Sequence, residues 1–207
     1  MIIHDVKQGE PEWFKLRAGK PSSSMFKSLI TGQGKPSTSI DNYAMELAAE
    51  VKTGGPIDDG FFGNKYTKRG TELEPLSRSW YEMENQVAVQ EVGFITDDLL
   101  QYGASTDGLV GDEGLVEFKN LITKTFMELL VYQARNQGKT PPGYNPQVQG
   151  ELLVTGRKWA DLVFYHPKFE PVVVRHTPDK VFQAELKKQL TICINKRNEF
   201  VKLVKGK

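Results

Sequence analysis

One segment near the middle of the chain constrains the fold most, because it combines two short strand candidates with acidic side chains. Residues 101–105 and 115–119 both have the composition of short strands, and the Asp-Gly and Gly-Asp-Glu-Gly sequences between them supply the residues that tight connections need. If these strands are neighbours, Asp107 stands at the end of one strand beside Glu117 on the other. The segment therefore predicts a strand pair with two carboxylates close together.

Alternation along the second strand adds a lysine to this pair of acids. Side chains alternate between the two faces of a strand, so Glu117 and Lys119 project to one face while Val116 and Phe118 project to the other. Two carboxylates on one face bind a hard cation such as Mg²⁺ through oxygen, and an adjacent ammonium can orient or help to deprotonate a water. Asp107, Glu117 and Lys119 are thus typical of a metal-dependent nuclease site acting on a phosphodiester.

The same spacing also fits a solvated hairpin with alternating polar residues, since 26% of the chain is charged. The apolar neighbours Val116 and Phe118, however, indicate an interior strand, where unpaired charge is costly. A buried metal accounts for the acids better than surface decoration does.

Length and composition bound the remaining possibilities. A chain of 207 residues suits one domain, which we place at 1–207. The single cysteine, Cys193, excludes an internal disulfide and a cysteine-based zinc site, and we expect it to be a small buried hydrophobe on the last helix. No apolar run approaches ~20 residues and no signal peptide is apparent, so we expect no membrane span and a cytoplasmic, reducing location.

The net charge is only +1, although nucleic-acid partners usually require a basic surface. Any DNA-binding surface must therefore be local. Residues 180–207 contain eight Lys or Arg residues against two Glu residues. A solvated face of an amphipathic helix explains this excess better than a surface that tracks DNA.

The order of predicted elements indicates an α/β (α+β) domain with a central mixed sheet flanked by helices and the site at a sheet edge. Pro75 predicts that one helix kinks or restarts at that position. Helices are expected at 10–18, 22–29, 40–51, 73–83, 123–136, 146–154 and from 182 to 204, and strands at 87–95, 101–105, 115–119, 161–165 and 172–176, with a loop at 138–144.

Several motifs, taken in chain order, resemble those of the lambda exonuclease family of phage recombination nucleases, within the PD-(D/E)XK superfamily. They extend from position 13 to about 155, so the resemblance covers most of the chain, and the joint match is far more specific than any single piece. Besides the acid, acid and lysine triplet, the motifs are Trp13-Phe-Lys-Leu-Arg17-Ala-Gly19 with Ser22-Ser-Ser24, Arg69-Gly-Thr-Glu-Leu-Glu74, Ser105-Thr-Asp107-Gly-Leu109, and Gln147-Val-Gln149 leading into Leu-Leu-Val-Thr155.

The resemblance implies roles for individual positions. The metal ligands would be Asp107, Glu117, the backbone carbonyl of Phe118 and Glu74, and Lys119 would activate or position the nucleophilic water. Gln149 would be the active-site glutamine. A terminal 5′-phosphate would be held by Arg17, Ser24 and Ser105, which is chemically coherent because an arginine offers a bidentate fork and hydroxyls add neutral donors.

Two departures from the family pattern bear on these roles. Pro75 directly follows Glu74, which disfavours a continuous helix there and makes that ligand less secure. Lys20 and Pro21 precede the serines, so the sequence leaves open which of the three, from Ser22 to Ser24, meets the phosphate.

The resemblance further implies a Mg²⁺-dependent 5′ to 3′ exonuclease that degrades one strand of linear double-stranded DNA and leaves 3′ overhangs for recombination. It implies two Mg²⁺ ions per site with Mn²⁺ as a substitute, a ring-shaped homotrimer threading DNA, and a single-strand annealing protein as partner. Two alternatives stay open from the sequence. One is a structure-specific or restriction-like endonuclease of the same superfamily, and the other is a non-catalytic DNA-binding module.

Overall fold

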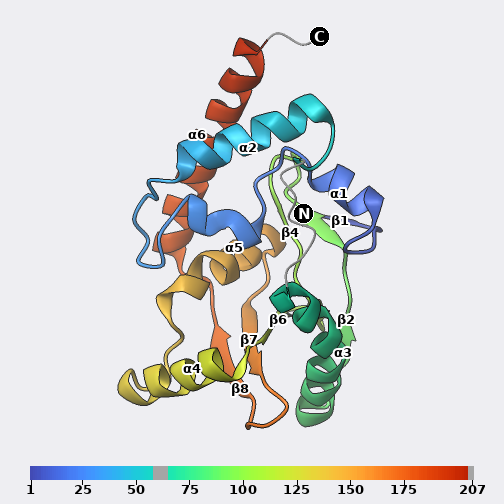
Figure 1. Cartoon of the computed structure of the whole chain (residues 1–207), viewed down its shortest axis with the longest axis vertical. Helices are drawn as coiled ribbons and strands as arrows, with labels where there is room; N and C mark the ends of the chain where they lie inside the picture. Colours follow the sequence, from blue (N-terminus) through green and yellow to red (C-terminus); the bar gives the residue numbers. More distant parts are fainter. Residues whose placement is uncertain (58–64, 205–207) are drawn as a thin grey trace.

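The computed structural model describes residues 1–57 and 65–204, which form two β-sheets surrounded by helices (Figure 1). The larger sheet has five strands in the order β2-β5-β6-β7-β8, and the smaller has three in the order β1-β3-β4. Only β6 and β7 pair in parallel, so the larger sheet is mixed, as predicted. The strands are β1 (Ile2–His4), β2 (Val89–Gln90), β3 (Phe94–Thr96), β4 (Gly103–Ala104), β5 (Gly108–Val110), β6 (Gly114–Asn120), β7 (Trp159–Tyr165) and β8 (Val172–His176).

The helices largely follow the apolar spacing of the sequence. They are α1 (Pro11–Arg17), α2 (Ile40–Thr53), α3 (Lys65–Asn85), α4 (Thr123–Arg135), α5 (Asn145–Thr155) and α6 (Lys180–Leu203), with the 3₁₀ helices η1 (Ser23–Ser28) and η2 (Pro142–Tyr144). The prediction of a helix at 22–29 is confirmed in position, but the segment winds as a 3₁₀ helix. In the described part of the chain, no helix combines the length and apolar character needed to cross a membrane.

The prediction that residues 101–105 pair with residues 115–119 is wrong. Residues 101–105 contribute β4 to the smaller sheet, where it pairs with β3, while the antiparallel partner of β6 is β5, which begins directly after Asp107. β5 escaped prediction because it has only three residues and begins at a glycine. Asp107 therefore lies in the link between the two sheets.

The expected position of the site at a sheet edge is also wrong. β6 is the third of five strands, and Leu115, Val116 and Glu117 within it are at most 5% exposed. A strand covered on both faces and paired on both sides has no solvent-facing side, which explains the apolar character of its sequence.

Helices cover both faces of the larger sheet. On one face Tyr81 of α3 packs with Phe118 and Val163, and on the other Leu152 of α5 packs with Leu115 in a cluster that includes α4. A third cluster joins η1, α2 and α6, and the last two helices lie at the top of the view in Figure 1. It includes the buried Cys193, as predicted, and the buried side chains of Phe182, Leu186 and Leu190.

Two helix predictions need correction. The sequence leaves a kink or a restart open at Pro75, and the structure excludes the restart: α3 continues through the exposed proline, and buried Ser77 and Tyr81 anchor the turns that follow it. The apolar spacing of the last helix predicts an inward face that runs from Phe182 to Val204, but this face ends early in α6: Ile194 is buried, whereas Val204 is 55% exposed.

Candidate active site

Two hydrogen bonds fix the loop that carries Asp107 against the central strand. The buried hydroxyl of Thr106 donates to the Val116 carbonyl at 2.9 Å, and the backbone N–H of Phe118 donates to Asp107 Oδ2 at 2.6 Å. Within a strand the N–H and C=O of one residue point to the same side, so the Phe118 carbonyl faces the side on which Asp107 lies. The structure thus brings Asp107 beside the glutamate strand, although by a route other than the predicted one.

Glu117 and Lys119 project to the same face of β6, as predicted, and meet Gln147 and Glu151 of α5. Lys119 Nζ donates to Glu117 Oε1 at 2.7 Å and to Gln147 Oε1 at 2.9 Å. Gln147 Nε2 donates to Glu117 Oε1 at 2.6 Å and to Glu151 Oε1 at 2.9 Å. One lysine and one amide therefore hold together two carboxylates in the interior.

One oxygen of each of these carboxylates has no hydrogen-bond partner among the described residues. Glu117 is 5% exposed and Glu151 is fully buried, yet Oε2 of each is unpaired. Buried polar atoms are nearly always paired, because leaving one unsatisfied costs about 1–3 kcal/mol or more when charged. These oxygens are therefore open to a cation or a proton.

The electrostatics of the cluster are unbalanced toward negative charge. Burial, followed by repulsion from Glu117, raises the pKa of Asp107 well above its usual range, and the same two causes raise the pKa of Glu151. Burial alone would lower the pKa of Lys119, but attraction to Glu117 and Asp107 outweighs it and raises that pKa. A single ammonium is too little positive charge for the three carboxylates of Asp107, Glu117 and Glu151.

These residues fit a hard divalent cation. Asp107, the unpaired Glu117 Oε2 and the Phe118 carbonyl are all oxygen ligands, which Mg²⁺ prefers. Within the described residues, no three His, Cys, Asp or Glu side chains form a complete metal cage. Mg²⁺ in proteins is commonly bound by one or two carboxylates together with several waters.

Glu74 lies at the margin of the cluster. Its carboxylate interacts electrostatically with Asp107 and Glu117, and burial is the largest cause that raises its pKa. Its Oε1, however, accepts from Arg78 at 2.6 Å, and Arg78 also pairs with Glu91 at 2.5 Å. Glu74 is thus near enough to interact electrostatically with the carboxylates of the site, while its own carboxylate forms an ion pair with Arg78 on the same helix.

The residues predicted to hold a terminal phosphate form a second cluster, organised by Trp13. The Arg17 guanidinium lies 3.9 Å from the centroid of the Trp13 ring and donates to Ser22 Oγ at 3.0 Å. Trp13 Nε1 donates to Ser105 Oγ at 3.0 Å, and Ser24 Oγ lies 3.5 Å from Ser22 Oγ. The structure therefore brings the predicted residues together.

Arg17 itself is partly buried, and burial lowers its pKa. No carboxylate in the described part of the chain forms an ion pair with it, although Glu50 contributes a weaker attraction. A guanidinium stays charged in proteins, so Arg17 offers donors to an external anion.

A cavity of about 230 Å³ is lined by residues from both clusters. The lining includes Ser24 from the Arg17 cluster, and Lys119 and Gln147 from the cluster around Glu117. The other lining residues are Ser23, Lys27, Gly143 and Tyr144. The predicted loop at 138–144 thus contributes one wall, mainly through η2.

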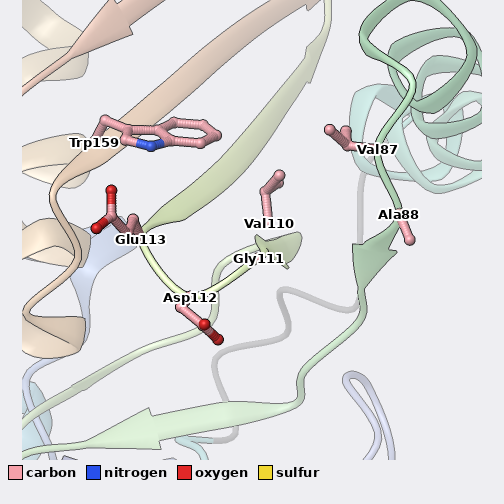
Figure 2. A pocket seen from close by; sticks show the side chains of 7 residues that line it. All are labelled: Val87, Ala88, Val110, Gly111, Asp112, Glu113 and Trp159. Atoms are coloured by element: carbon pink, nitrogen blue, oxygen red, sulfur yellow. The ribbon is translucent and has the colours of Figure 1, made fainter.

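A second, larger cavity of about 490 Å³ lies at the opposite end of β6, around the turn that precedes it (Figure 2). Trp159 and Val110 line it, and Lys158 pairs with Glu113 at its rim. It contains none of the predicted site residues. Size alone does not make it the reaction site, because the buried charge lies elsewhere.

The expectation for Gln149 is corrected by the structure. Gln149 Nε2 donates to the Thr177 carbonyl, and Gln149 Oε1 accepts from the Asp179 N–H. Both ends of the Gln149 amide are therefore bonded to the backbone that leads into α6. Positions two apart on a helix point to different sides, and Gln147 is the residue that faces the cluster.

Sequence reasoning missed Glu151 and Gln147 as members of the acidic cluster, and it left open which of Ser22 to Ser24 joins the second cluster. Gln147 and Glu151 are four positions apart on a predicted helix, a spacing that puts both on one face, and this signal was available. The contact of Ser22 with Arg17 depends on the 3₁₀ winding of η1, which the sequence did not indicate.

The comparisons with known proteins agree with this fold. The family of the YqaJ-like viral recombinase domain matches residues 12–158. Among solved structures, the alkaline exonuclease LHK-Exo from Laribacter hongkongensis is 32% identical, with 94% of this chain and 95% of that chain covered and a TM-score of 0.81. A structure of LHK-Exo in complex with dAMP is similar over the same shares, with a TM-score of 0.80.

A phage-related exonuclease from Haemophilus somnus 129PT shares the fold, with a TM-score of 0.70, 16% identity, and 89% of this chain and 96% of that chain covered. No protein with a curated description matches the chain. The mixed α/β fold places the chain in the structural class that these solved exonucleases share. The chain belongs to the YqaJ-like viral recombinase family. The expected relationship to the lambda exonuclease family is thereby confirmed, and the chain is a homologue of an alkaline exonuclease.

Proposed function

We propose that this protein is a Mg²⁺-dependent 5′ to 3′ exonuclease that degrades one strand of linear duplex DNA from its ends and leaves 3′ single-stranded overhangs for recombination. We also propose that its 207 residues act as a single nuclease domain. The observation that carries the proposal is the shared cavity, in which Ser24 of the Arg17 cluster lies on the same lining as Lys119. A residue that would recognise an end phosphate and a residue that would serve hydrolysis thus line one cavity.

Asp107, Glu117 and the Phe118 carbonyl would hold the cation, with Glu74 as a further carboxylate at the margin. When bound, Mg²⁺ supplies a Lewis acid for the phosphate and a more acidic water, and Mn²⁺ would substitute. We propose two ions per site. The repulsion between Asp107 and Glu117 supports this assignment, because a divalent cation offsets it.

Lys119 would orient the attacking water through its ammonium, which Glu117 and the Gln147 amide hold in place. In the reaction, the water oxygen bonds to the phosphorus between the first and second nucleotides, and the bond from phosphorus to the 3′ oxygen of the first nucleotide breaks. That oxygen takes up a proton, and the first nucleotide leaves as a 5′-mononucleotide. The shortened strand keeps a 5′-phosphate.

This product explains why a phosphate pocket is useful in each cycle. Every cleavage presents a new 5′-phosphate, which Arg17 and the hydroxyls of Ser24 and Ser105 can bind again. The homologue LHK-Exo has been crystallised in complex with dAMP, a deoxynucleoside monophosphate. A mononucleotide product is consistent with that complex.

We further propose that the protein assembles as a homotrimeric ring and works with a single-strand annealing protein. A net charge of +1 gives a weak electrostatic hold on DNA, and encirclement would replace part of it. Light scattering of the purified protein, with and without duplex DNA, tests the trimer.

The test of the function uses the wild-type protein with Mg²⁺ and two forms of one plasmid. We expect linear plasmid to be degraded to acid-soluble nucleotides and the covalently closed circle to survive. Cleavage of the closed circle would favour a restriction-like endonuclease instead. No cleavage of either form would favour the non-catalytic DNA-binding alternative.

A further inference from the structure

Glu151 is the one fully buried acid of the cluster that the proposed reaction does not use. It lies on α5, four positions after Gln147, so both side chains occupy one helix face. Its Oε1 accepts from Gln147 Nε2 at 2.9 Å, and its Oε2 has no partner among the described residues. Keeping such an acid in the interior is costly, and this cost calls for a role in the site.

The hydrogen bonds of Gln147 indicate that role. Its Nε2 faces two acceptors, Glu117 and Glu151, while its Oε1 faces the Lys119 ammonium. A reversed amide would set its oxygen against two carboxylates and its NH₂ against an ammonium, so all three contacts would become repulsive. Glu117 already accepts a bond from Lys119 on the same oxygen, which leaves Glu151 as the acceptor committed to the amide alone.

We propose that Glu151 is a positioning residue, which fixes the Gln147 amide so that its oxygen holds Lys119 against Glu117 and leaves Glu117 Oε2 free for the cation. This inference rests on the proposed nuclease function. Glu151 acts through Gln147 and touches neither the substrate nor the cation. What the site needs from position 151 is an acceptor oxygen at the correct reach, and its charge is dispensable.

The rival role, a direct metal ligand, makes the opposite demand, because a ligand must supply a charged carboxylate. Two conservative variants separate the roles. Glu151→Gln keeps the reach and an acceptor oxygen but loses the charge. Glu151→Asp keeps the charge but withdraws the acceptor by one methylene. If Glu151 is a positioning residue, E151Q should be more active than E151D. If Glu151 is a metal ligand, E151D should be more active than E151Q.

The assay measures release of acid-soluble nucleotides from linear duplex with Mg²⁺, as kcat and KM. We expect E151Q to stay within about threefold of wild type and E151D to lose about 10- to 100-fold in kcat with KM little changed, the range for an outer residue that orients a site. The matched control is E185D, since Gln189 Nε2 donates to Glu185 Oε1 at 2.6 Å in the same four-residue spacing on α6. That control should change kcat by less than about twofold.

A double-mutant cycle tests whether Glu151 works through the amide. In a Gln147→Met background, adding E151D should lower kcat by less than about twofold, because the amide it positions is gone. Full additional loss in that background would overturn the proposal, as would an E151Q variant as slow as E151D. An E151D variant with wild-type kcat would overturn it as well. Should E151D melt below the assay temperature, E151M takes its place in the same comparison.

A separate readout keeps this inference distinct from the proposed function. Calorimetric titration of Mn²⁺ alone into the metal-free protein should give E151Q an affinity within about threefold of wild type, because Glu151 is not a ligand. A larger loss assigns Glu151 to the metal and refutes positioning. If wild type itself released no nucleotides while binding Mn²⁺, the nuclease function would fail and positioning for catalysis would fail with it. Active wild type with active E151D would sink positioning alone.

Discussion

Replacing Arg17 by methionine tests end recognition. The guanidinium lies 3.9 Å from the Trp13 ring centroid, so methionine keeps an apolar stem on the ring while removing the charge. A hydrogen bond to a charged group contributes about 1.5–3 kcal/mol, and each 1.36 kcal/mol is a factor of ten. Wild type should therefore prefer 5′-phosphorylated over 5′-hydroxyl ends by about 10- to 150-fold in kcat/KM.

The substitution should slow phosphorylated ends by about the same factor and hydroxyl ends little, because it removes a contact that hydroxyl ends never make. Losing the contact with the ring costs about 1 kcal/mol, which lowers Tm by about 2–4 °C in a chain of this length. The assay compares matched duplexes with either end group. Exposed Lys15 on the same helix supplies the control, K15M, which loses one charge without touching the pocket. Equal slowing of both ends by R17M would refute the phosphate assignment.

Four further predictions concern the interior of the protein. Asp107→Asn should abolish cleavage, with wild-type-like folding by circular dichroism, and residual activity within about tenfold of wild type would contradict its place as a ligand. The folded-state pKa of Asp107 is raised, so the stability of the metal-free wild type should fall as the pH rises through that pKa. In thermal melts in EDTA, the Tm of D107N should fall less than that of wild type over the same pH range. An equal fall in Tm would contradict this electrostatic account. Lys119→Ala should keep Mn²⁺ binding but cut turnover by about 10² to 10⁴, whereas loss of metal binding would make Lys119 a structural partner. Burial raises the pKa of the Cys193 thiol to about 12, so a thiol reagent should label it only after unfolding, and rapid native labelling would place it at the surface.

Much of the fold followed from periodicity, since β6, α2, α4, α5, β7, β8 and α6 lie where the apolar spacing predicted them. What failed were features set by tertiary contacts. The pairing of β6 with β5 instead of β4 depends on strands of two or three residues, too short for periodicity to register. The central position of β6 follows from the parallel pairing with β7, far along the chain.

The parts of the candidate site that could be predicted are those whose contacts lie within one strand or helix. Glu117 and Lys119 share a strand face, so alternation alone places them together. The sequence does not distinguish Gln147 from Gln149, because both lie on α5. The hydrogen bonds of the Gln149 amide to Thr177 and Asp179 depend on how α6 packs against α5. Glu151 stayed hidden because a glutamate on a helix is ordinarily a solvated residue, and its burial depends on packing against the sheet.

The measurement that tests the central claim most directly follows two labels on one linear duplex that carries 5′-phosphates. One duplex is labelled in the 5′-terminal nucleotide and the other in the 3′-terminal nucleotide, and each is incubated with the wild-type protein in Mg²⁺ or in EDTA. The account predicts that the 5′ label appears at once as a mononucleotide in Mg²⁺, that the 3′ label stays in long single strands, and that EDTA stops both. Earlier release of the 3′ label, or undiminished release in EDTA, would contradict it.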